Sequence, residues 1–133
     1  MVAVVAEENG APRPVRLAGL VAAVEGAGVL IATGVLGVAT ALDRPDSYGR
    51  ALFAVVIGLV AGLLLLRIAR GVARVQGWAR APVVVAQALL APVGYTLAVT
   101  AEMPPYGVPI LALCLAEICL LLTPAARLAF LDR

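Results

Sequence analysis

Four long apolar stretches set the pattern of hydrophobic and polar positions along this chain. The first, residues 17–42, contains one ionisable side chain, Glu25. Three more follow at residues 48–70, 81–100 and 106–123, separated by short segments that contain proline, glycine and charged residues. A helix of about 20 apolar residues crosses the roughly 30 Å hydrocarbon core of a bilayer. The pattern therefore predicts four transmembrane helices, preceded by a flexible tail at residues 1–14.

Composition places the whole chain in the membrane class. Of its 133 residues, 63% are hydrophobic and 14% are charged, and the mean hydropathy is +1.06. A soluble domain usually has about a quarter of its residues charged. An A-x-A pattern at residues 39–41 resembles a signal-peptide cleavage site, but the apolar stretch before it exceeds the about 7–15 residues of a signal-peptide core. We expect residues 1–133 to form one all-α integral membrane domain, a bundle of four transmembrane helices.

The arginines are divided unevenly between the two sides of the predicted bundle. All ten basic residues are arginine, and the chain has no lysine or histidine. Two of them, Arg44 and Arg50, belong to one side. The other eight belong to the opposite side: Arg13, Arg16, Arg67, Arg70, Arg74, Arg80, Arg127 and Arg133. Cytoplasmic segments carry the excess of positive charge, so both termini are predicted to be cytoplasmic. A composition dominated by Ala, Val, Leu, Gly and Arg is typical of a GC-rich genome and indicates a bacterial inner membrane.

Three polar side chains interrupt the apolar stretches at similar depth. With a rise of about 1.5 Å per residue, Glu25 lies about 12 Å, and Gln87 and Glu117 each about 9 Å, from the predicted cytoplasmic ends of their helices. Arg67 stands at the cytoplasmic end of the second helix and can reach inward. Because an acidic side chain at the centre of a membrane helix costs roughly 2.5–3.5 kcal/mol, we predict that these four residues meet in one polar layer.

Two interpretations of this polar layer stay open. In the first, Glu25 and Glu117 pair with Arg67, Gln87 or backbone groups and hold the helices together. In the second, the carboxyl groups form a protonatable site that is open to the cytoplasm. The sequence favours the first interpretation, because Arg67 is available and tightly packed helices leave little room for a ligand.

Small residues predict close packing of the first two helices. Ala54, Gly58 and Gly62 are spaced four apart in the second helix, and Gly26 belongs to a similar series in the first. Such series let two helices approach closely within a bilayer. The alternative is that they form the contact surface of a homodimer.

A second group of arginines predicts contact with lipid. Arg70, Arg74 and Arg80 surround Trp78, and tryptophan beside arginine is typical of the membrane interface. These arginines are candidates for binding anionic lipid headgroups, or they serve only to orient the chain. We find no nucleotide-binding, haem or metal-binding motif and no nucleophile beside a base, so we predict no cofactor and no enzyme activity. The net charge of +2 is too small to predict a nucleic-acid partner.

Two resemblances bear on these expectations. A glutamate within the first helix of a short four-helix chain resembles, in architecture only, the small multidrug resistance transporters, although the aromatic residues of their substrate chamber have no counterpart here. The whole chain is similar to small four-helix membrane proteins of actinobacteria. This similarity is carried by Glu25-Gly26, Trp78-Ala79-Arg80, Pro92 in the third helix and Thr123-Pro124. It implies no established activity.

The function favoured by the sequence is therefore that of a non-catalytic structural or accessory membrane protein. Its expected partners are the lipid bilayer and either a larger membrane protein or further copies of the same chain. The alternative is a small proton-coupled transporter or channel in which Glu25 and Glu117 exchange protons with a substrate. A membrane enzyme ranks third, because nothing in the sequence marks a substrate site.

Overall fold

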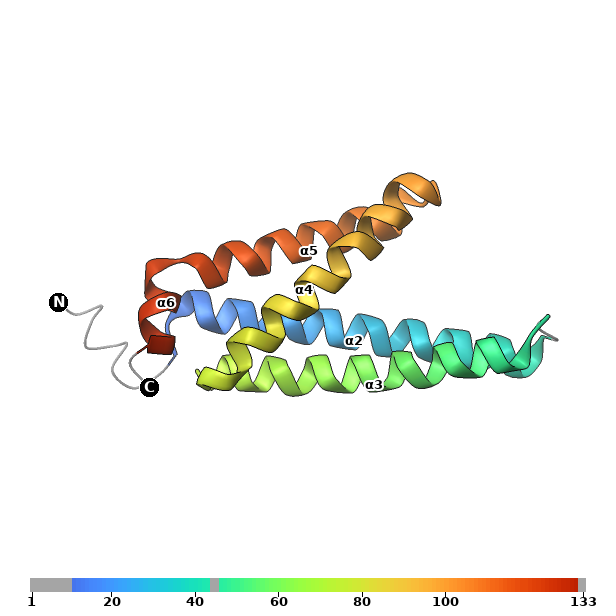
Figure 1. Ribbon diagram of the computed structural model, residues 1–133, viewed down its shortest axis with the longest axis horizontal. Helices are drawn as coiled ribbons and strands as arrows, with labels where there is room; N and C mark the ends of the chain where they lie inside the picture. The colour runs from blue at the N-terminus through green and yellow to red at the C-terminus, as the bar shows by residue number, and fades with distance from the viewer. Residues whose placement is uncertain (1–10, 44–45, 132–133) are drawn as a thin grey trace.

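The computed structural model describes residues 11–43 and 46–131, and within them it contains only helices (Figure 1). The helices are α2 (Arg13–Leu42), α3 (Tyr48–Ala73), α4 (Arg80–Tyr95), α5 (Pro104–Leu122) and α6 (Pro124–Leu131). A short 3-10 helix, η1 (Gly77–Ala79), precedes α4, and a π-helical segment, η2 (Thr96–Thr100), follows it. No strand occurs in these residues, so the predicted all-α class is confirmed.

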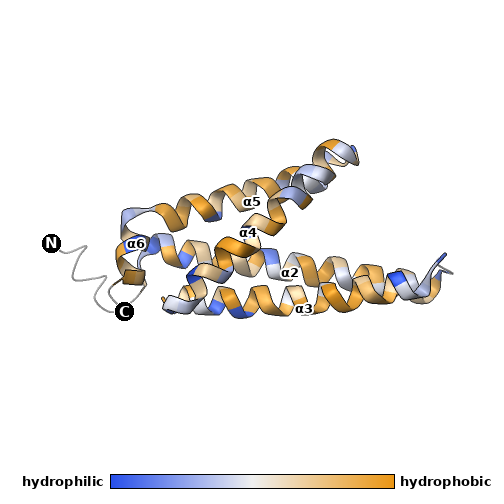
Figure 2. Ribbon diagram, viewed as in Figure 1, coloured by the Kyte–Doolittle hydropathy of each residue, from blue (hydrophilic) through white to orange (hydrophobic). Residues whose placement is uncertain are grey.

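Four helical segments are long and apolar enough to cross a membrane: Arg13–Leu42, Tyr48–Ala73, Gly77–Thr100 and Pro104–Leu122. They correspond to the four predicted stretches. The first begins four residues earlier than predicted, and the second continues to Ala73 instead of ending at residue 70. The apolar surface that they leave exposed (Figure 2) is expected of helices that face lipid.

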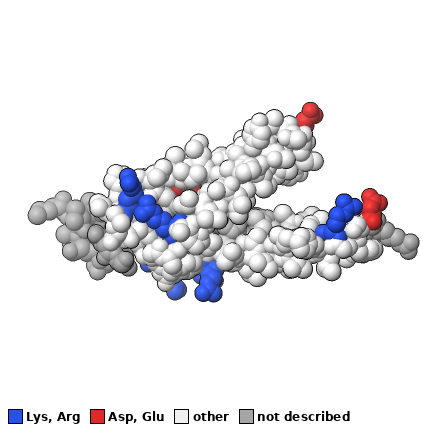
Figure 3. Space-filling view, in the orientation of Figure 1, with Lys and Arg blue, Asp and Glu red and all other residues white. Residues whose placement is uncertain are grey.

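The spans form two antiparallel hairpins that meet at one end and separate toward the other. In the first hairpin, α2 and α3 lie side by side along their length, and in the second, α4 and α5 join at η2 (Figure 1). The start of α2, the end of α3, η1 and α6 gather at the end where the hairpins meet. We call this the basic end, because all but one of the described arginines lie there: Arg13, Arg16, Arg67, Arg70, Arg74, Arg80 and Arg127 (Figure 3). Arg44 and Arg133 lie outside the described residues.

Three of the four predicted small residues do pack α2 against α3. A Cβ atom added to Gly26 would lie 3.1 Å from a side chain of α3, and one on Gly62 would lie 2.6 Å from a side chain of α2. A Cβ atom on Gly58 would collide with the Thr33 hydroxyl, which already donates a hydrogen bond to the Val29 carbonyl. These glycines allow the two helices to approach closely, as predicted for helices one and two.

Ala54 does not share this contact, and its assignment to the packing face is wrong. It is exposed. A helix turns by about 100° per residue, so a spacing of four drifts by about 40° at each step, and Ala54 is about 80° away from Gly62. Val55 is seven residues before Gly62 and lies only about 20° from the contact line. Its side chain faces Gly37 of α2, where an added Cβ atom would lie 3.9 Å from the Val55 methyl groups.

The second hairpin is closed by two glycines that the sequence analysis did not single out. A Cβ atom on Gly107 of α5 would collide with the backbone around Ala98, and one on Gly94 of α4 would lie 3.0 Å from the side chains of Ile110 and Leu111. The helices α4 and α5 therefore cross most closely near the π-helical segment.

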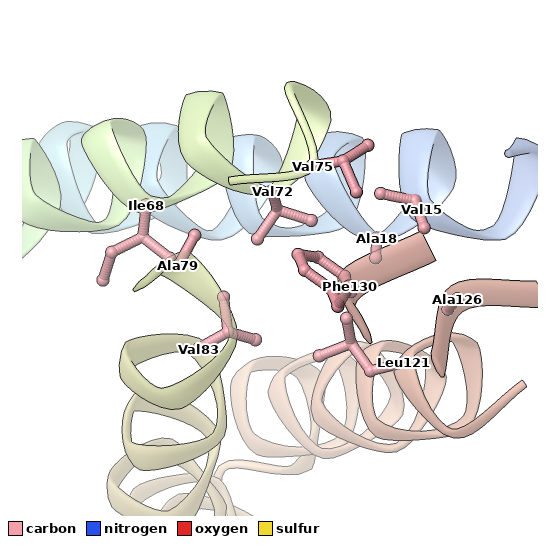
Figure 4. Packing of buried hydrophobic residues seen from close by; sticks show 10 residues of the cluster. All are labelled: Val15, Ala18, Ile68, Val72, Val75, Ala79, Val83, Leu121, Ala126 and Phe130. Carbon is pink, nitrogen blue, oxygen red and sulfur yellow. The ribbon is translucent and has the colours of Figure 1, made fainter. Parts of the chain in front are cut away.

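A hydrophobic cluster fills the basic end, and we call it the basic-end core. The segment between α3 and α4 contains η1, and the chain after α5 forms α6, whose Phe130 lies in the middle of the cluster (Figure 4). The cluster joins α2, α3, η1, α4, α5 and α6 through ten buried residues: Val15, Ala18, Ile68, Val72, Val75, Ala79, Val83, Leu121, Ala126 and Phe130.

Candidate functional site

The three polar side chains predicted at similar depth meet in the interior. Glu25 comes from α2, Gln87 from α4 and Glu117 from α5, and they are 7%, 1% and 0% exposed. The Gln87 side-chain nitrogen (Nε2) donates hydrogen bonds to Oε2 of Glu25 at 2.8 Å and to Oε2 of Glu117 at 3.3 Å. One amide group thus joins three helices from both hairpins.

The hydrogen bonding of this cluster is incomplete. The Oε1 atoms of Glu25, Gln87 and Glu117 are buried and have no hydrogen-bond partner among the described residues. A buried polar atom without a partner costs about 1–3 kcal/mol, and more when it is charged. Three oxygen atoms that can accept hydrogen bonds therefore face an interior that supplies no donor for them.

Arg67 does not belong to the cluster, contrary to the predicted four-residue layer. Its side chain is exposed and lines a hollow with Arg70 and Arg74 on the outer face of α3. The face of α3 that is turned toward α2 instead carries glycine and aliphatic residues. The charge of Arg67 therefore stays exposed and its predicted pairing with the carboxyl groups is not formed, whereas the pairing with Gln87 that the same interpretation named is present.

An apolar cleft of about 380 Å³ leads to Glu25 from the open side of the hairpins. Its walls are α2, α4 and α5, and Glu25 is the one acidic residue that lines it. The other lining residues are Val24, Gly28, Val29, Ala32, Leu90, Pro105, Tyr106, Pro109, Ile110 and Leu113. No sequence signal placed Tyr106 or the prolines of α5 in a cleft.

The cluster separates this cleft from the basic-end core. Along α2, core residue Ala18 precedes Glu25 and cleft residue Ala32 follows it. In α4, Val83 of the core precedes Gln87 and Leu90 of the cleft follows it. Glu25 is thus reached from the side away from the basic end, and not from the basic end as the open-site interpretation expected, while Glu117 does not line the cleft.

The chemistry of the site is that of acid groups in an apolar surrounding. Among the described residues, no group of three or more His, Cys, Asp or Glu side chains could hold a metal ion. Two carboxyl groups beside an apolar cleft can bind and release protons, and they can bind a cation whose remaining surface is apolar.

Of the predicted lipid-contacting arginines, Arg70 and Arg74 are exposed, and Arg80 is half-buried at the start of α4. Arg70 and Arg74 line the same outer hollow of α3 as Trp78. Arg80 is not among the residues of that hollow.

Comparisons of the chain with protein-family models, curated proteins and solved structures gave no match. The resemblances drawn from the sequence therefore gain no support beyond architecture. The fold and site together define a small helical membrane protein with four apolar spans and a buried Glu–Gln–Glu cluster.

Proposed function

We propose that this chain is a multi-pass protein of a bacterial inner membrane that carries a small, largely apolar cation in exchange for protons. In this proposal both termini and the basic end are cytoplasmic, the cleft opens toward the opposite side, and the chain is not an enzyme. We therefore favour the transporter interpretation over the accessory role that the sequence favoured.

A single observation carries the proposal: Glu25, whose Oε1 is buried without a hydrogen-bond partner, lies at the inner end of an apolar cleft and joins a cluster with a second carboxyl group. A structural cluster gains most when every buried polar atom is paired. Here the missing partner is a positive charge or a donor, and the cleft volume of about 380 Å³ lies within the about 300–1,000 Å³ range of small-molecule sites. Because the cleft walls are almost wholly apolar, a ligand that fits them has an apolar body and one cationic group.

Exchange follows from competition for the same carboxyl groups. When the cation leaves, Glu25 and Glu117 need protons to neutralise them in the membrane interior. When a cation enters, those protons are released. Complete transport also requires the basic-end core to separate, because this core closes the cluster toward the basic end.

The test is flux across proteoliposomes under an imposed pH gradient, with ethidium as an apolar cationic probe. Wild-type protein is expected to move ethidium against the proton flow, and Glu25→Gln is expected to abolish that movement, because an amide cannot exchange a proton. Glu102→Gln is the matched control, since Glu102 is exposed and outside the cleft. Flux through Glu25→Gln equal to that of the wild type would overturn the proposal.

A structural or accessory role is the second candidate, and one observation favours it. Gly34 of α2 is exposed and has nothing within 4 Å of an added Cβ, so a small residue faces outward on this helix. Such positions let another helix approach closely in lipid. If wild-type proteoliposomes show no proton-linked flux while a membrane partner copurifies with the wild type and is lost from Gly34→Leu, the accessory role is correct.

A further inference from the structure

Two hollows at the basic end lie on either side of one strip of α3. The first, of about 650 Å³, lies between α2 and α3, and Arg16, Gly19, Ala69 and Ala73 are among its lining residues. The second, of about 630 Å³, lies on the outer face of α3 toward η1. Leu66 and Arg70 line both hollows. Leu66 and Arg70 are about one helical turn apart. A ligand that contacts both residues therefore reaches from an apolar side chain to a basic one.

The second hollow has the side chains that recognise phosphate. Arg67, Arg70 and Arg74 are spaced by three and four residues, which places them on one face of α3. All three are exposed. Arginine binds phosphate oxygens through two parallel N–H donors, so neighbouring arginines on one face form a suitable anion site.

Trp78 completes this hollow at the level of the membrane surface. Its indole nitrogen donates a hydrogen bond of 2.9 Å to Oε1 of Gln76, and both residues line the hollow. Tryptophan is enriched where headgroups meet the hydrocarbon. The hollow therefore lies at the depth of lipid phosphates.

The order of apolar and basic residues along α3 matches the order of groups in a phospholipid. Leu63 and Leu66 precede the arginines and lie deeper in the span, as acyl chains lie deeper than the phosphate. On the other side of Arg70, the groove between α2 and α3 is lined largely by glycine and alanine, which leaves room for a chain.

We propose that this site binds an anionic phospholipid, with its phosphate held by Arg67, Arg70 and Arg74 and its acyl chains beside Leu66. The proposal is independent of the carboxyl cluster and of its transport role. It differs from the sequence-based set of lipid contacts, because Arg67 takes the place of Arg80.

The experiment uses the full chain in detergent micelles and the fluorescence of Trp78, the chain's single tryptophan. Phosphatidylglycerol is expected to change the emission of Trp78 at concentrations at which phosphatidylcholine does not. Since an arginine near a charged membrane surface contributes about 1 kcal/mol, Arg70→Gln is expected to weaken phosphatidylglycerol binding about fivefold. Arg127→Gln is the matched control, because Arg127 is exposed at the same end but on α6.

Three outcomes would overturn the proposal. Phosphatidylglycerol binding by Arg70→Gln that equals the wild type would show that the site is elsewhere. An equal loss in Arg127→Gln would show diffuse attraction to the basic end. An equal emission change with inorganic phosphate alone would show a free-anion site. If Arg70→Gln does not keep its helical circular dichroism, Arg74→Gln replaces it, with the same expected loss.

Discussion

At the scale of single residues, Gln87 decides how the two hairpins are joined. Its amide nitrogen has two hydrogens, and it directs hydrogen bonds to Glu25 and Glu117. A hydrogen bond contributes about 0.5–1.5 kcal/mol net, and leaving a buried partner unpaired costs about 1–3 kcal/mol. An aliphatic residue at this position would leave both carboxyl groups without a donor.

We expect Gln87→Leu to lower the free energy of unfolding by about 1–3 kcal/mol for each carboxyl group left without its donor. The measurement is unfolding in mixed micelles of increasing SDS content, followed by circular dichroism. The double-mutant cycle supplies the control: in the Glu25→Gln, Glu117→Gln background, the same Gln87→Leu change is expected to cost less, because no carboxyl group remains to be paired. An equal cost in both backgrounds would show that the hydrogen bonds do not stabilise the fold.

At the scale of helices, the contact between α2 and α3 depends on spacing as much as on residue size. Gly58 and Gly62 lie at the contact, while Ala54, an equally small residue four positions earlier, has turned away from it. Successive contacts follow alternating steps of about four and three residues, because these steps track the 3.6-residue turn.

We expect Gly58→Leu to destabilise the first hairpin by about 1–3 kcal/mol, because its side chain would overlap Thr33. Ala54→Leu adds an apolar side chain to the same helix at an exposed position and is expected to stay within about 0.5 kcal/mol of the wild type. Both variants can be compared by the same SDS titration. Equal losses in the two variants would contradict this assignment of the packing face.

At the scale of the whole molecule, the two hairpins form a wedge that is closed at the basic end and open at the other. The basic-end core joins α2 through α6, whereas the tips of the two hairpins lie apart (Figure 1). The carboxyl cluster lies where the packing changes from closed to open. This position places Glu25 at the inner end of the cleft, while the packed core closes the cluster toward the basic end.

If the arginine bias orients the chain, the basic end and both termini are cytoplasmic. We expect reporters fused to Met1 and to Arg133 to be active on the cytoplasmic side, and a cysteine introduced at Ser47, between α2 and α3, to react with an impermeant thiol reagent from the opposite side. Labelling of both native cysteines is subtracted with the unmodified chain as control. Termini on opposite sides, or both outside, would contradict the orientation.

The sequence by itself determined the membrane class, the four spans and the similar depth of Glu25, Gln87 and Glu117. These properties depend on hydropathy and on the rise of a helix, both of which are local. Depth along a helix, however, does not specify the direction in which a side chain points. For this reason the sequence could not separate Arg67 on the outer face of α3 from the three residues that face inward.

Tertiary structure alone decided which groups meet and from which side they are reached. Gln87 contacts Glu25, 62 residues away in the chain, only because α4 crosses α2. Likewise, Pro105 and Tyr106 line the cleft because the second hairpin leans away from the first. Such angles between helices result from many close contacts far apart in sequence, among them Gly107 against the backbone of Ala98, and no local pattern records them.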